Sequence, residues 1–293
     1  MKRTTCAALF AASLLGACGG GGGASPAPPA TAQGTSAFTS QNYLDATWIA
    51  IIAFDRIETA AEVIDAAYTL ALVNGDVSGT YNCAGGGDVV YARTGNNRQF
   101  TANQCRTVNL ADVTTYRSGT LVTNDAVVAQ AGNFTYLASA NIALSNAVVD
   151  FSTTNPISNR TGDESFSGAV AVAGTATQVS GSGTLTVTRA GRADAYTQIA
   201  VAGPQADEID FDLGTFGVST PRFPSSFTVQ FNAATLTATL TGPDTSRLNV
   251  ALAPGSTDTL RFTILNSAGQ QTFTSNVQIF SMESLAARTR ALQ

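Results

Sequence analysis

The chain has 293 residues, a formal net charge of −5 and only 12% charged residues. It contains no histidine, and its only lysine is Lys2. These absences exclude Ser-His-Asp and Cys-His catalytic sites, Schiff-base lysines, P-loops and His/Cys zinc sites, so only carboxylate chemistry or no catalysis remains. The acidic balance also argues against nucleic acid as a partner.

The first 17 residues have the pattern of a secretory signal peptide. Residues 1–3 (MKR) form a positive start, and residues 6–15 (CAALFAASLL) form an uncharged apolar run. A run of about ten residues is too short to span a bilayer as a helix. Small residues then precede a cysteine in residues 15–18 (LGAC), which is typical of a cleavage site.

Residues 15–18 resemble the lipobox of bacterial lipoproteins, residue by residue. The resemblance implies cleavage before Cys18, lipidation of its thiol and acylation with chains such as palmitate. Because two or more acyl chains hold a protein stably on a bilayer, the anchor would be firm. Gly19 replaces the Asp that often retains members of this family at the inner membrane, so we expect the outer membrane, with the side undetermined. The alternative is an ordinary signal peptide with an incidental cysteine.

Residues 18–38 are uncharged and contain almost no large apolar side chain, so we expect a flexible tether rather than part of a core. Such a segment spans about 25 Å on average. We expect one folded domain after it, in which a helix at 39–75 belongs with a β-rich region at 76–293. A division of that region near residue 203 remains an alternative. Loss of Lys2 and Arg3 with the leader would make the mature net charge −7.

Apolar residues at helical spacing predict one long helix over residues 41–73, with Ser40 as its cap and Asn74-Gly75 as its end. Asp55, Glu58, Glu62 and Asp65 form an acidic outer stripe with Arg56 to one side. We expect the opposite face to pack on a sheet. The alternative is a helix that also lies on lipid or plugs a concave sheet.

From residue 77 onward the apolar period changes to two, and turn signals separate short runs rich in Thr and Val. The pattern predicts a mainly β fold: a large curved or partly closed antiparallel sheet with the long N-terminal helix packed on it. The predicted strands cover residues 88–94, 98–104, 118–124, 133–140, 165–173, 183–189, 196–201, 208–213, 226–231, 234–240, 247–252, 259–265 and 271–280.

Cys83 and Cys105 are the two cysteines that would remain in the body of an exported protein, and we expect them to form a disulfide. In the chain-entropy model, closing a loop of this length stabilises the fold by about 3 kcal/mol. The pattern Cys-x-Gly-Gly from Cys83, followed by a hairpin and Cys105, loosely resembles uncharacterised β-rich proteobacterial outer-membrane lipoproteins. That resemblance concerns the fold and implies no activity.

The densest acidic cluster includes Glu208, Asp210 and Asp212, which would share one face of a strand. A solvated strand face is the simpler interpretation, and a ligand site, a Ca²⁺ site or a carboxylate pair is the alternative. Four aromatic side chains are expected in the core, with a pocket lining as the alternative: Phe216, Phe223, Phe227 and Phe231.

We therefore expect a lipid-anchored cell-envelope protein with a non-catalytic structural or binding role, without cofactor or metal. Its partners would be the membrane, through the lipid anchor, and a protein, glycan or lipid of the envelope. Two alternatives remain. One is a carrier or chaperone of an apolar ligand in a helix-covered half-barrel. The other is a carboxylate-based hydrolase of envelope sugars, which needs two acidic groups facing each other across a cleft.

Overall fold

The computed structural model describes residues 36–84, 86–108, 114–124, 137–150, 162–174, 177–189, 191–204, 209 and 211–278. Within them the chain forms one long helix, α1 (Tyr43–Val73), and then fourteen strands. The strands are β1 (Gly79–Asn82), β2 (Asp88–Thr94), β3 (Asn97–Val108), β4 (Thr114–Asn124), β5 (Leu137–Asp150), β6 (Gly162–Gly174), β7 (Gln178–Arg189), β8 (Arg192–Pro204), β9 (Leu213–Ser219), β10 (Phe227–Asn232), β11 (Thr237–Thr241), β12 (Arg247–Leu252), β13 (Thr259–Leu265) and β14 (Gln271–Gln278).

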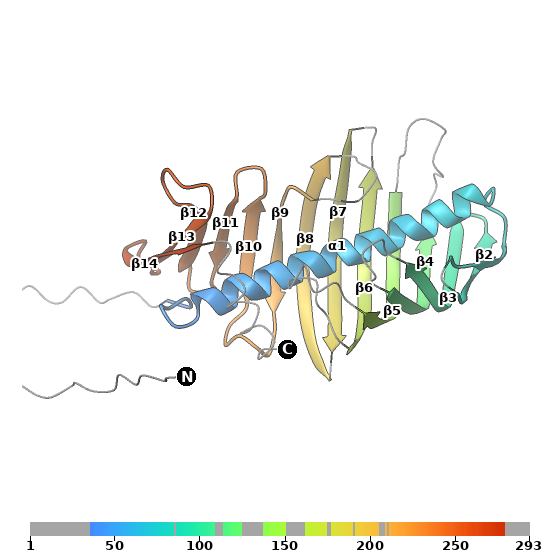
Figure 1. Cartoon of the computed structure of the whole chain (residues 1–293), viewed down its shortest axis with the longest axis horizontal. Coiled ribbons are helices and arrows are strands. Elements are labelled where there is room, and N and C mark those ends of the chain that lie inside the picture. The colour runs from blue at the N-terminus through green and yellow to red at the C-terminus, as the bar shows by residue number, and fades with distance from the viewer. Residues whose placement is uncertain are drawn as a thin grey trace, which may run out of the picture. The chain divides into compact units, whose positions relative to one another are not determined.

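Each strand pairs in antiparallel fashion with the next strand in the sequence, so the sheet is a simple meander. The strand order runs from β1 at one edge to β14 at the other, and the sheet is curved and open (Figure 1). The pairing continues from β8 to β9, so the sheet is not divided near residue 203. The predicted mainly β fold with one packed helix is confirmed.

Most predicted strands are present, and β2, β12 and β13 have the predicted bounds. The prediction for 208–213 is wrong, because Ile209, Phe211 and Asp212 are not in a strand and β9 begins at Leu213. The backbone N–H of Phe211 donates instead to Oε1 of Glu58 on α1, at 3.2 Å. A contact with the helix therefore replaces the strand pairing that the alternating sequence suggested. The sequence also missed β1 and most of β5.

Helix α1 crosses the sheet from β14 to β3 (Figure 1). Near its start the Tyr43 ring lies 5.2 Å from the rings of Phe262 and Phe273, and near its end Tyr68 lies 6.5 Å from Phe100. Along the helix, fully buried alanines allow it to approach the sheet closely: Ala46, Ala53, Ala60, Ala61 and Ala71. The 31 residues make a helix about 46 Å long, which suits a sheet of many strands.

The helix begins two residues later than predicted, and its N-cap is Asn42 rather than Ser40. The Asn42 side chain accepts a hydrogen bond from the Thr39 N–H at 2.7 Å and donates to the Ala37 carbonyl at 3.1 Å. Phe38 is also buried, and its ring lies 6.1 Å from those of Phe223 and Phe227. The folded domain thus includes residues 36–38, which we had assigned to the tether, because an aromatic side chain there fills the core.

The predicted end of the helix is confirmed. Gly75 adopts a φ of +67°, and its N–H donates to the Leu72 carbonyl at 3.0 Å. The N–H of Asp76 donates to the Ala71 carbonyl at 2.7 Å, which completes a Schellman motif. Glycine allows this left-handed conformation without a Cβ penalty.

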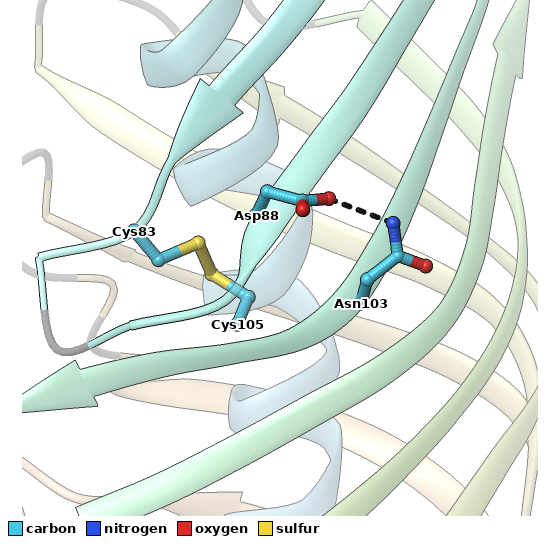
Figure 2. The surroundings of a disulfide bond; sticks show 4 residues. All are labelled: Cys83, Asp88, Asn103 and Cys105. Atoms are coloured by element: carbon cyan, nitrogen blue, oxygen red, sulfur yellow. Dashed lines mark hydrogen bonds between the residues drawn. A yellow bond between two sulfur atoms is a disulfide. The ribbon is translucent and has the colours of Figure 1, made fainter.

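A disulfide between Cys83 and Cys105 links the segment after β1 to β3, as Figure 2 shows. The two Cα atoms lie 5.4 Å apart, within the usual range for a disulfide. Beside it, the side-chain amide of Asn103 donates to Oδ1 of Asp88 at 2.7 Å. Because β1 is an edge strand of only four residues, this covalent link holds an edge that backbone pairing alone would hold weakly.

Candidate functional site

A cluster of charged and polar side chains lies buried between α1 and one end of strands β6 to β9. The guanidinium of Arg56 donates to Oε1 of Glu164 at 2.8 Å, to Oδ2 of Asp194, and to the Tyr196 hydroxyl at 2.7 Å. Only 2% of the Arg56 residue is exposed. We call this group the Arg56 cluster, and it comprises Arg56, Glu164, Arg189, Asp194, Tyr196, Thr220 and Arg222.

Further contacts in the Arg56 cluster bring in β7 and the segment after β9. Arg222 pairs with Asp194, and the Thr220 hydroxyl donates to Oδ1 of the same carboxylate at 2.5 Å. Arg189 lies 3.8 Å from Glu164. Each carboxylate therefore faces two guanidinium groups, as buried charges require.

Burial and neighbouring groups have opposite effects on the pKa values of Arg56 and Tyr196. Burial by itself would lower the pKa of Arg56, but its contacts with Tyr196 and Glu164 outweigh that effect, so the pKa is raised and the side chain stays charged. Burial raises the pKa of Tyr196 to about 12, although the neighbouring Arg56 opposes the rise. The tyrosine is therefore a neutral hydrogen-bonding group at neutral pH.

The geometry of the Arg56 cluster favours a structural role over a catalytic one. A hydrolytic carboxylate pair faces a cleft in which substrate and water fit. The side chains of Glu164 and Asp194 are only 3% and 5% exposed, and both are bound to arginine. The cluster instead holds α1 on the sheet at one point along its length.

Sequence reasoning placed Arg56 beside the acidic stripe and missed its burial. A signal was present, because Glu164 and Asp194 occupy strand positions whose alternate neighbours, Phe166 and Tyr196, face the core. Acidic residues at core-facing strand positions require a buried cation as a partner. Arg56 supplies that cation, because it lies on the side of the helix that faces the sheet.

A second feature is an apolar groove between the first half of α1 and strands β9 to β13. Its volume is about 270 Å³, and its wall is almost entirely carbon. Ile51 and Phe54 contribute from the helix, and the sheet contributes mainly Phe216, Val229, Phe231 and Leu240. We call this feature the apolar groove.

The apolar groove ends beside the turn that joins β10 to β11. Leu236 in that turn is 48% exposed and lines the groove. The Phe54 and Phe231 rings, 4.6 Å apart, are both only partly buried. A groove of this size is near the lower end of ligand pockets, which are about 300–1,000 Å³, so it suits a slender ligand.

The expectations for the four phenylalanines are largely confirmed. Phe216, Phe223 and Phe227 are buried in the core. Phe216 also lines the apolar groove together with the half-buried Phe231. Phe216 therefore belongs both to the core and to the lining of the groove.

Of the predicted acidic site, Glu208 and Asp210 lie outside the described residues. Asp212 is described and half-buried, and its backbone carbonyl accepts a hydrogen bond from the Ala233 N–H at 2.6 Å. Among the residues that the structure describes, no three His, Cys, Asp or Glu side chains come together as a metal site would require. A joint site of the three acids therefore stays a prediction.

No helix in the described part of the chain is long and apolar enough to cross a membrane. Comparison of the chain with protein-family models, with curated protein sequences and with solved structures found no match.

Proposed function

We propose that this chain is a lipid-anchored protein of the bacterial outer membrane that binds an apolar ligand without catalysis. The apolar groove carries the proposal, since it offers a carbon-lined site at the surface with an exposed leucine, Leu236, beside it. Binding in such a site is driven by removal of apolar surface from water.

The ligand we propose is a single acyl chain of a membrane lipid. None of the residues that line the groove is ionisable, so the bound part of the ligand is uncharged. The groove lies along the N-terminal half of α1, the helix that follows the proposed tether from Cys18 in the chain. The anchor would therefore keep the groove within reach of lipid.

Binding can be measured with the fluorescent probe N-phenyl-1-naphthylamine and its displacement by palmitate. The mature chain carrying Cys18→Ser serves as the reference, because it lacks an acyl chain of its own. Ala238 faces the groove from β11, and Ala238→Trp would fill the space. We expect affinity for both compounds to fall at least about tenfold, equivalent to about 1.4 kcal/mol.

Ala251→Trp is the matched control, because Ala251 lies on the neighbouring strand β12 and alternates with the core-facing Val250. A second variant, Leu236→Arg, changes an exposed side chain and so tests the groove without risk to the core. Unchanged palmitate binding in both Ala238→Trp and Leu236→Arg would show that the groove is not the site.

A further inference from the structure

The face of the sheet that points away from α1 has a different chemistry from the core face. The strand pairing aligns one residue from each of six adjacent strands in a row on this face. The row contains Thr215, Gln230, Thr239, Asn249, Thr263 and Thr274. Their alternate neighbours, such as Phe216, Val229 and Leu240, are buried against the helix side, so these polar side chains point outward.

Two hollows lie on this outward face, both along β9. The first, of about 200 Å³, is lined by the polar side chains of Thr197, Gln198, Ser219, Ser226, Thr228 and Thr241. The second, of about 580 Å³, is lined by those of Thr215, Gln230, Asn232, Thr237 and Thr239.

The two hollows follow one another along the strand direction. On β9, the consecutive outward residues Thr215 and Gly217 line the second and the first hollow, respectively. On β10, Gln230 and Thr228 do the same. Seven residues of β9 span about 20 Å. Gly217 has no side chain to fill the floor of the first hollow. We call the two hollows together the outer trough.

The lining of the outer trough defines the chemistry of a ligand. No residue that lines either hollow is ionisable, so a charged ligand would find no countercharge there. Hydroxyl and carboxamide groups both donate and accept hydrogen bonds. Leu213, 49% exposed in the second hollow, adds one apolar contact. Such a surface suits an uncharged ligand that carries many hydroxyl groups and some exposed C–H surface.

We propose that the outer trough binds a neutral oligosaccharide. The strands beneath it favour this ligand over an extended peptide. The backbone groups of β9 and β10 are already paired with strands on both sides, so a peptide cannot add to the sheet there as an extra strand. Recognition depends on side chains alone, and these match the hydroxyl groups of a sugar. The trough opens on the face of the sheet opposite the apolar groove, although the second hollow and the groove share four lining residues: Phe231, Asn232, Thr237 and Ala238.

Isothermal titration calorimetry of the mature chain carrying Cys18→Ser, with linear hexamers of glucose and of N-acetylglucosamine, tests the proposal. We expect at least one hexamer to bind, with an affinity that stays within about twofold from 50 to 500 mM salt, because no ion pair contributes. Thr215→Arg places a long side chain in the trough and should weaken binding about tenfold.

Thr263→Arg is the matched control, because Thr263 lies in the same outward row but on β13, outside both hollows. It should leave the affinity within about twofold of the parent, since surface substitutions away from a contact have small effects. Gln230→Ala removes an exposed carboxamide without added bulk and should weaken binding by less than Thr215→Arg. Absence of binding by both hexamers, or equal affinities of the Thr215→Arg and Thr263→Arg variants, would overturn the proposal.

Discussion

Arg56 shows, at the scale of a single residue, how the helix is fixed to the sheet. Its guanidinium contacts carboxylates from two strands, β6 and β8, and a tyrosine hydroxyl. A buried ion cluster is not by itself a source of stability, because removal of the charges from water offsets their attraction. The cluster does destabilise any other placement of the helix, because that placement would leave charges buried without partners.

Replacement of Arg56 by methionine, Arg56→Met, should destabilise the protein strongly. The substitution keeps much of the side-chain volume but leaves Glu164 and Asp194 buried with one positive partner fewer each. We expect the free energy of unfolding to fall by about 3–5 kcal/mol, measured by urea denaturation.

Arg261→Met is the control for this experiment, since Arg261 is exposed on β13, and it should change the free energy by less than about 0.5 kcal/mol. Similar values for the two variants would mean that the Arg56 cluster does not hold the helix in solution.

The C-terminal end of α1 is attached to the sheet through the carboxylate of Asp76. Asp76 follows the helix and accepts hydrogen bonds from Tyr91 and from Arg98, the latter at 2.8 Å, while Arg93 lies 2.6 Å away. Burial alone would raise the pKa of Asp76, but the hydrogen bonds from Arg98 and Tyr91 and the charges of both arginines lower it below its usual value. The ionised carboxylate thus ties the end of the helix to β2 and β3.

Acid should weaken this attachment. The pKa of Asp76 is lower in the folded state than in the unfolded state. The stability that its carboxylate contributes is therefore present above the unfolded pKa of about 3.9 and is lost as the pH falls through the folded pKa. We expect Asp76→Asn to lower the free energy of unfolding at pH 7. The further decrease of this free energy between about pH 5 and pH 3 should be smaller than in the parent, as measured by urea denaturation at each pH.

Asp88→Asn, which alters an exposed hydrogen bond to Asn103, should leave the pH profile near that of the parent. An unchanged profile in Asp76→Asn as well would contradict the role assigned to the Asp76 carboxylate.

At the scale of the whole molecule, α1 covers one face of the fourteen-stranded sheet that the described residues form. The covered face provides the core and the apolar groove, and the outer face provides the outer trough. In our proposal, the chain is anchored to the membrane through lipid on Cys18. Both proposed sites would then work at a membrane surface.

The proposed anchor is tested on the 293-residue chain expressed in a bacterium. Cys18→Ala should abolish incorporation of labelled palmitate and move the protein from the membrane fraction to the soluble fraction, because the proposed acyl chains would be attached to this residue. Cys6→Ala, which changes a cysteine inside the proposed leader, should leave both labelling and fractionation unchanged. Palmitate labelling that persists in Cys18→Ala would refute the lipobox assignment.

Much of the architecture could be predicted from local pattern. Helical spacing and the Asn74-Gly75 signal predicted α1 and its end, and alternating residues predicted most strands. Local pattern failed where a distant contact decided the outcome. Phe211 lies in an alternating segment, but its N–H is bonded to Glu58, 153 positions away. Phe38 is in a segment with the composition of a tether, yet its ring packs on Phe223 and Phe227.

The sequence by itself determined the class of the fold, the antiparallel order of its strands, the helix and the Cys83–Cys105 pair, because these depend on periodicity, short connections and cysteine count. Only the tertiary structure revealed the Arg56 cluster, the apolar groove and the outer trough. The Arg56 cluster and the apolar groove combine α1 with strands far along the chain, and the outer trough combines side chains of the neighbouring strands β8 to β11. Strand register and helix placement decide which side chains meet. A local sequence pattern does not specify these contacts, because they form only when the helix packs on the sheet.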